Sequence, residues 1–106
     1  ITMAKHIRVY EDFFGCRDCE LTGLPGGDVH HIKARGMGGS KKRDNIENLM
    51  ALNQVAHDYF GDKKQFMEWL QEWHEEYMIH RTPMYIIRPQ DETLKTFLLK
   101  NYDNYI

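Results

Sequence analysis

The sequence predicts a small α+β protein, on three observations. Two short apolar runs, residues 28–32 and 49–52, flank a glycine-rich polar segment, as the strands of a β-hairpin do. Residues 62–80 carry apolar side chains at the 3.6-residue period of a helix. The chain has 106 residues, of which 42% are hydrophobic, and this length suits one domain with a buried core. We therefore expect a single domain over residues 1–106.

The N-terminal third contains one segment that fits two structures and one predicted strand. Residues 5–14 mix β-branched, aromatic and charged residues, which fits a strand or a short helix. Glycines around Pro25 mark a turn, and residues 28–32 alternate in part like a strand after it. Residues 36–39 are rich in glycine and basic residues follow them, which is typical of an irregular polar loop.

The middle of the chain is predicted to complete the hairpin and to continue into a helix. Residues 49–52 are short and apolar, which suits the return strand. Asn53 is a good N-cap for a helix that runs to about Phe60, and Gly61 is a typical C-terminal stop. The predicted order is therefore strand, loop, strand, helix.

The long helix predicted over residues 62–80 has one apolar stripe and an acidic outer face. Asp62 stands where it can cap the start of this helix. The glutamates of the outer face are unfit for contact with DNA. The helical spacing of the aromatic residues favours packing in the core over base stacking: Phe66, Trp69, Trp73 and Tyr77.

The C-terminal part is predicted to add a strand and a helix. Pro83 ends the long helix, residues 84–88 favour a strand, and residues 91–101 favour a final short helix. Three apolar side chains of that helix are expected to face inward: Leu94, Phe97 and Leu98. This part completes a core that the hairpin and the short helix cannot supply alone.

Basic residues are concentrated locally although the formal net charge is −2. Five of them precede Asp44 in one short stretch that has no acidic residue: Lys33, Arg35, Lys41, Lys42 and Arg43. A polyanion would have to bind at this stretch, because the charge of the whole molecule does not attract it. Taken alone, such a stretch is more often a solvated loop than a binding site.

The sequence disfavours membrane insertion and secretion. Its longest apolar runs span only a few residues, whereas a membrane helix needs about 20, so no membrane span is expected. The first residues lack the apolar stretch of a secretory signal, and Ile1 in place of Met indicates a processed chain or a fragment of a longer one. Cys16 and Cys19 are too few and too close to staple a secreted fold, which favours the cytoplasm.

Four polar residues form the centre of chemical interest. His30 and His31 are adjacent on a predicted strand, where neighbouring side chains point to opposite faces. The two imidazoles are therefore expected to have different roles, one binding a metal ion and the other acting on a substrate. Asn48 and then His57 follow them along the chain.

This arrangement resembles the HNH nuclease family, whose ββα-metal (His-Me finger) fold packs a β-hairpin on one helix around one divalent ion. The matching residues are 28–32, the glycine-rich loop 36–39, 45–49 and 56–58. The resemblance covers residues 16 to about 62, so residues from about 62 to 106 would be a C-terminal extension with a further helix and strand.

The resemblance implies an endonuclease that hydrolyses DNA and leaves 5′-phosphate and 3′-hydroxyl ends. His31 would be the general base that activates water, since an imidazole is largely neutral yet basic near neutral pH. His30 and His57 would be the metal ligands, and Asn48 would hold His31 in register by bridging backbone groups across the loop. Mg²⁺ or Mn²⁺ is expected to support turnover, and Zn²⁺ or Ni²⁺ to bind tightly. The basic stretch from Lys33 to Arg43 would contact phosphates.

The chain departs from the family pattern at three positions. Many relatives have a second cysteine pair at the positions of Asn53 and Ala56, and some have a third histidine at the position of Gly61. Cys16 and Cys19 could therefore hold a structural zinc only with help from a residue such as His6, and otherwise are small buried residues. His6, His74 and His80 are interpreted as ordinary core or surface residues.

Two other functions compete with the nuclease interpretation. One is a module of the same fold that binds nucleic acid or another partner without cleaving it. The other is a structural zinc domain, which would unfold when the metal is removed.

Overall fold

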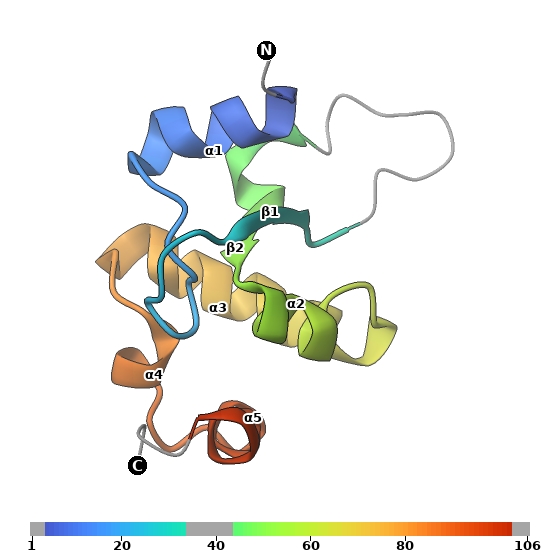
Figure 1. Ribbon diagram of the computed structural model, residues 1–106, viewed down its shortest axis with the longest axis vertical. Helices are drawn as coiled ribbons and strands as arrows, with labels where there is room; N and C mark the ends of the chain where they lie inside the picture. Colours follow the sequence, from blue (N-terminus) through green and yellow to red (C-terminus); the bar gives the residue numbers. More distant parts are fainter. Residues whose placement is uncertain (1–3, 34–43, 103–106) are drawn as a thin grey trace.

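The computed structural model of this protein describes residues 4–33 and 44–102. Within these residues it has five α-helices and one two-stranded antiparallel sheet, which confirms the α+β class (Figure 1). The elements in chain order are α1 (Lys5–Phe14), β1 (Asp28–His31), the 3₁₀ turn η2 (Ile46–Asn48), β2 (Leu49–Leu52), α2 (Gln54–Phe60), the 3₁₀ turn η3 (Lys64–Phe66), α3 (Met67–His80), α4 (Met84–Ile87) and α5 (Glu92–Asn101). No helix in this described part has the length and apolar character needed to span a membrane.

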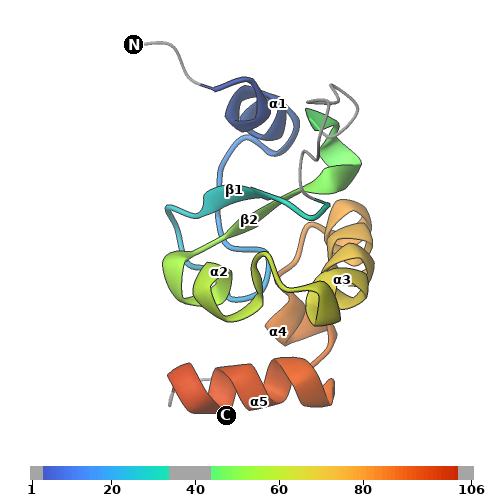
Figure 2. The ribbon, with the colours of Figure 1, turned by 90° about the vertical axis from the view of Figure 1, so that its right-hand side faces the viewer.

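Residues 5–14, for which the sequence allowed either a strand or a short helix, form helix α1. It ends at Gly15, which has the left-handed φ of 81° and donates its N–H to the carbonyl of Glu11. Glycine adopts this conformation without the steric cost that other residues incur. Helix α1 lies across one face of the hairpin and buries Tyr10 against it (Figures 1 and 2).

The hairpin forms the middle layer of the molecule, and both of its faces are covered (Figure 2). Strand β1 pairs with β2 so that His30 lies opposite Met50 and His31 opposite Leu49. Met50 and Leu52 face the main core with α2, α3 and α5, whereas Leu49 and Ala51 face a smaller core under α1. All four residues of β2 are therefore buried, although successive side chains point to opposite sides.

Helix α2 has the predicted ends. The side chain of Asn53 accepts a hydrogen bond from the N–H of Ala56, and Gly61 donates its N–H to the carbonyl of His57. These two contacts satisfy backbone groups that a helix end would otherwise leave without partners. Because the cap is local to the sequence, the bounds of α2 could be predicted from the residues alone.

The long helix begins later than predicted. Helix α3 starts at Met67, after the turn η3, and Asp62 does not cap it. Asp62 instead has a φ of 57°, a left-handed conformation outside any helix. Trp73 and Tyr77 are buried as expected, but Trp69 is 38% exposed, with its ring 5.7 Å from that of Phe66.

The strand predicted over residues 84–88 is wrong, because this segment forms helix α4. The first two amides of α4, at positions 84 and 85, donate to the carbonyls of Glu20 and Leu21. The next two, at positions 86 and 87, donate to the carbonyl of Pro83. Proline is well suited to the start of a helix, where its missing N–H costs nothing. Helix α5 follows as predicted, with Asp91 as its N-cap and Leu94, Phe97 and Leu98 buried.

Candidate functional site

The adjacent histidines of β1 lie on opposite faces of the hairpin, as the alternation of a strand requires. His30 is on the same face as Met50, toward α2, and His31 is on the same face as Leu49, toward α1. Two distinct polar groups result, one around each histidine. The sequence predicted this separation from adjacency alone.

His30 meets His57 and Asp62 on the α2 side of the hairpin. The centroids of the two imidazole rings are 5.0 Å apart, with their planes nearly perpendicular. One potential ligand atom from each of the three residues lies within 4.8 Å of the others. Three chain segments thus converge: strand β1, the last turns of helix α2 and the residues that follow it.

His30 is the most buried member of this group. Only 6% of its surface is exposed, and its Nε2 atom is buried without a hydrogen-bond partner among the described residues. Burial lowers the pKa of His30 and the neighbouring His57 lowers it further, although the charge of Asp62 acts in the opposite direction. His30 is therefore held in its neutral form, which is the form that binds metal ions.

Gly61 allows the chain to turn tightly beside His57. A Cβ atom at this position would lie 2.6 Å from the carbonyl oxygen of His57 and 3.2 Å from its ring Nε2. The φ of Gly61 is −68°, so the glycine is required here by space and not by its dihedral angle. Position 61, where some HNH nucleases carry a third histidine, thus has no room for a side chain while His57 keeps this orientation.

A pocket of about 290 Å³ opens beside His30 and Asp62. Its apolar wall comes from Ile32, Phe60 and helix α3, and Lys63 and Lys64 stand at its edge. His30 and Asp62 therefore border a space that can admit a small ligand. The pocket lies between the end of strand β1, the turn that follows helix α2 and the start of helix α3.

His31 belongs to a second polar group on the α1 side. Its Nε2 atom is 2.7 Å from Oδ1 of Asp44, which is almost fully buried. A carboxylate can only accept a hydrogen bond, so Nε2 carries the proton and Nδ1 is the nitrogen that can accept one. The ring of His6 lies 4.7 Å from that of His31, and the three side chains also have potential ligand atoms within 4.8 Å.

Asn48 links the two sides of the hairpin just beyond His31, where strand β1 ends and strand β2 begins. Its side-chain oxygen accepts from the N–H of Lys33 at 2.8 Å, and its side-chain nitrogen donates to the carbonyl of Lys33 at 3.0 Å. Its backbone carbonyl accepts from Ile32 at 2.9 Å. One residue thus fixes the backbone that directly follows His31.

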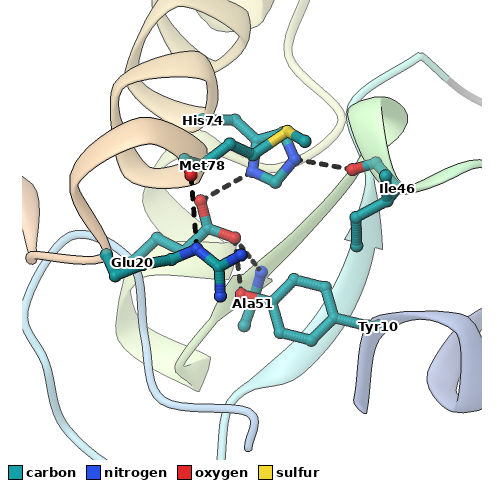
Figure 3. A network of polar contacts seen from close by, with 7 residues as sticks. Tyr10, Glu20, Ile46, Ala51, His74 and Met78 are labelled. Atoms are coloured by element: carbon teal, nitrogen blue, oxygen red, sulfur yellow. Dashed lines mark hydrogen bonds and ion pairs between the residues drawn. The ribbon is translucent and has the colours of Figure 1, made fainter. Parts of the chain in front are cut away.

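A buried polar network behind the hairpin was missed by the sequence interpretation (Figure 3). Glu20 accepts hydrogen bonds from the hydroxyl of Tyr10 at 2.6 Å and from the N–H of Ala51 at 3.2 Å, and its other oxygen is 2.7 Å from Nδ1 of His74. Nε2 of His74 contacts the carbonyl of Ile46 at 2.6 Å. His74 is thus a buried core residue with both ring nitrogens hydrogen-bonded, in agreement with the sequence prediction that it is an ordinary core or surface residue. Nothing in the sequence pattern had indicated a role for Glu20.

The structure describes three of the other predicted site residues: Cys16, Cys19 and Lys33. Lys33 is exposed, and Arg35, Lys41, Lys42 and Arg43 lie outside the described residues, as do the glycines 36–39. Cys16 is exposed and Cys19 is buried, both with free thiols. Over residues 4–33 and 44–102, neither cysteine belongs to a group of three potential metal ligands.

The group around His30 fits a divalent cation better than the group around His31. His31 and Asp44 already satisfy one another with a short hydrogen bond, whereas Nε2 of His30 is buried without a partner. A buried polar atom without a partner is costly and calls for an explanation such as a bound ion. Two imidazoles and one carboxylate are also a common ligand set for divalent transition metals.

Asp62 and Asp44 are the two acidic residues that sequence interpretation did not assign to the site. Asp62 had a usable signal, because it directly follows the position at which some HNH nucleases have a third histidine. Asp44 had none, since it stands 13 residues after His31 in the sequence.

Comparison with protein-family models, with curated proteins and with solved structures found no match to this chain.

Proposed function

We propose that this chain is a metal-dependent endonuclease of the HNH type, with a ββα-metal site formed by the hairpin and helix α2. The observation that carries the proposal is the arrangement about one strand. His30 meets His57 on one face, while His31 on the other face is hydrogen-bonded to a buried aspartate. The proposed single-metal hydrolysis of a phosphodiester uses both parts, a cation site and a general base.

His31 is the general base of the proposed reaction. Because Asp44 accepts the proton of Nε2, Nδ1 can take a proton from the attacking water. The carboxylate then stabilises the imidazolium that forms, and it keeps the ring in one orientation and one tautomer. Asp44 is therefore a positioning residue that acts through His31.

His30 and His57 hold the divalent ion in this proposal. A bound Mg²⁺ or Mn²⁺ would supply positive charge that stabilises the leaving 3′ oxygen and the charge on the phosphate. The low pKa of His30 keeps its imidazole neutral and able to bind. Asn48 fixes the backbone at Lys33 and so limits the movement of His31.

The substrate is a polynucleotide, and DNA is the first to test. The products would carry 5′-phosphate and 3′-hydroxyl ends. Basic residues of the stretch before Asp44 are expected to contact phosphates and so to give affinity without base selection. The pocket edge at Lys63 and Lys64 adds positive charge on the side of the cation site.

A plasmid-nicking assay tests the proposal. The wild-type chain should convert supercoiled plasmid to nicked or linear forms with MgCl₂ or MnCl₂ and lose this activity with EDTA. His31→Ala should reduce the rate by about 10² to 10⁴, the usual contribution of a general base, while Mn²⁺ binding stays near that of wild type. His80→Ala is the matched control, because His80 is 52% exposed at the end of α3.

Two outcomes would contradict the proposal. If the wild-type chain retards duplex DNA in a gel but leaves it intact with every divalent ion, a non-cleaving binding module is favoured. If His31→Ala cleaves at the wild-type rate, His31 is not the base. Circular dichroism of each variant establishes that a lost activity is not a lost fold.

A further inference from the structure

Asp62 stands at the cation site in a place that the family pattern does not provide. The resemblance assigns two ligands, His30 and His57, and the third-histidine position is Gly61. The chain nevertheless brings the carboxylate of Asp62 to the two imidazoles, with ligand atoms of all three residues within 4.8 Å. The same carboxylate and His30 border the 290 Å³ pocket.

We propose that Asp62 is the third ligand of the divalent cation, and that its carboxylate directs the site toward Mn²⁺. This inference rests on the proposed cation site of His30 and His57. Two imidazoles alone favour Zn²⁺ and Ni²⁺, whereas Mn²⁺ and Mg²⁺ prefer oxygen ligands. A negative oxygen from the chain therefore shifts the preference of the site toward the ions that support phosphodiester hydrolysis.

The buried Nε2 atom of His30 provides an independent reason for a ligand at this point. It has no hydrogen-bond partner among the described residues, and Asp62 does not supply one although it is close. A cation between the imidazoles and the carboxylate would satisfy the atom and would also compensate the negative charge of Asp62. No protein group described in the structure does both.

The backbone at Asp62 has the conformation that this placement requires. Its φ is 57°, which few residues other than glycine adopt, although aspartate and asparagine tolerate it. Gly61 lets the chain pass close to the carbonyl of His57 and turn at the next residue. Glycine would adopt this φ with less steric cost, so an aspartate at position 62 carries a conformational cost.

Two variants of Asp62 separate its role as a ligand from its role in the turn. Asp62→Asn keeps the size of the side chain and tolerates the positive φ, but removes the charge. Asp62→Gly removes the carboxylate and adopts the positive φ freely, so it should be at least as stable as wild type in thermal unfolding. The control is Asp58→Asn, which changes the same charge on the exposed surface of helix α2.

The measurement is calorimetric titration of each purified chain with MnCl₂, with free Mn²⁺ counted by electron paramagnetic resonance. Both Asp62 variants should bind Mn²⁺ at least about tenfold more weakly than wild type, since even outer-sphere partners of a metal contribute this much. Asp58→Asn should stay within about twofold, because exposed charges contribute little. In a parallel titration with ZnCl₂, Asp62→Asn should lose less affinity than it loses for Mn²⁺.

The possible failures are distinguishable. If Asp62→Asn and Asp62→Gly bind Mn²⁺ as wild type does while His30→Ala loses it, the cation site exists but Asp62 is not a ligand. That result overturns this inference and leaves the proposed function intact. If wild-type protein binds neither Mn²⁺ nor Zn²⁺, both proposals are wrong. Equal losses for Mn²⁺ and Zn²⁺ in Asp62→Asn would overturn the claim about preference.

Discussion

At the scale of single residues, the side chain of Asn48 stabilises the hairpin where strand β1 ends and strand β2 begins. Asn48 makes two hydrogen bonds to the backbone of Lys33 and is only 8% exposed. An amide side chain can donate to a carbonyl through its nitrogen and accept from an N–H through its oxygen at the same time. The residue type is therefore set by the two backbone groups that it bridges.

Asn48→Ala is expected to lower the free energy of unfolding by about 1 to 3 kcal/mol, because it leaves two backbone groups of Lys33 without their partners. Urea denaturation followed by circular dichroism measures this loss. Gln54→Ala is the control, since Gln54 is exposed and its side chain bonds the exposed Asp58, and it should change the stability by less than about 0.5 kcal/mol. Equal effects of the two substitutions would show that the bridge is energetically unimportant.

At the scale of elements, sequence and structure agree where the determining contacts are local. Asn53 and Asp91 accept hydrogen bonds from backbone amides three residues ahead, so the starts of α2 and α5 could be predicted from short windows. Residues 84–88 could not be, because a short apolar run fits a strand or a buried helix equally well. Their outcome depends on backbone contacts with Glu20 and Leu21, which are distant in sequence.

The same distinction applies to the candidate site. Adjacency predicted that His30 and His31 would point to different faces, and helix α2 was predicted well enough to bring His57 near the hairpin. Asp44 lies 13 residues after His31 in the sequence, and Asp62 follows the tight turn at Gly61, so their approach to the histidines depends on how the chain returns to the strand. No periodicity or cap in the sequence encodes such a return.

The network around Glu20 joins helix α1, strand β2 and helix α3 (Figure 3). Burial alone would lower the pKa of His74, but its hydrogen bond with Glu20 and the charge of that carboxylate outweigh burial, so the pKa is raised. Burial raises the pKa of Glu20 despite the hydrogen bonds that it accepts. Both shifts mean that the folded pair holds a proton more tightly than the unfolded chain does.

Because folding raises both pKa values, the contribution of the pair to the free energy of unfolding is predicted to decrease as the pH rises. Unfolded His74 loses its proton near a pH of about 6.5, whereas the folded pair still holds one. The contribution of the pair is therefore present below about pH 6.5 and is lost as the pH rises through the folded pKa of His74. His30 acts in the opposite sense below about pH 6.5, because its folded pKa is lowered.

Glu20→Gln should remove this part of the pH dependence. Urea denaturation at several values from about pH 6 to 9 gives the free energy of unfolding of variant and wild type, and the difference between the two curves isolates the pair from His30. The destabilisation by Glu20→Gln should be largest at the acidic end and decrease toward the alkaline end. Glu68→Gln, which neutralises an exposed glutamate near the start of helix α3, should leave the slope of wild type unchanged.

At the scale of the whole molecule, the C-terminal elements share a core with the candidate nuclease region. The main hydrophobic cluster contains residues from Cys19 to Leu98. Phe97 of helix α5 is fully buried, and its ring centroid lies 5.0 Å from that of Phe60 at the end of helix α2. The helix that carries His57 is therefore packed directly against the C-terminal part (Figure 2).

Phe97→Ala is predicted to destabilise the entire chain by about 3 to 5 kcal/mol, the usual cost of removing a buried aromatic ring. Because the cluster is shared, tryptophan fluorescence and far-ultraviolet circular dichroism should report one coincident unfolding transition that shifts to lower urea as a unit. Leu99→Ala on the same helix is the control; Leu99 is 43% exposed, and its loss should cost less than about 1 kcal/mol. Two separate transitions, with the C-terminal part unfolding first, would contradict a single domain and would mean that the hairpin and α2 hold the candidate site without α5.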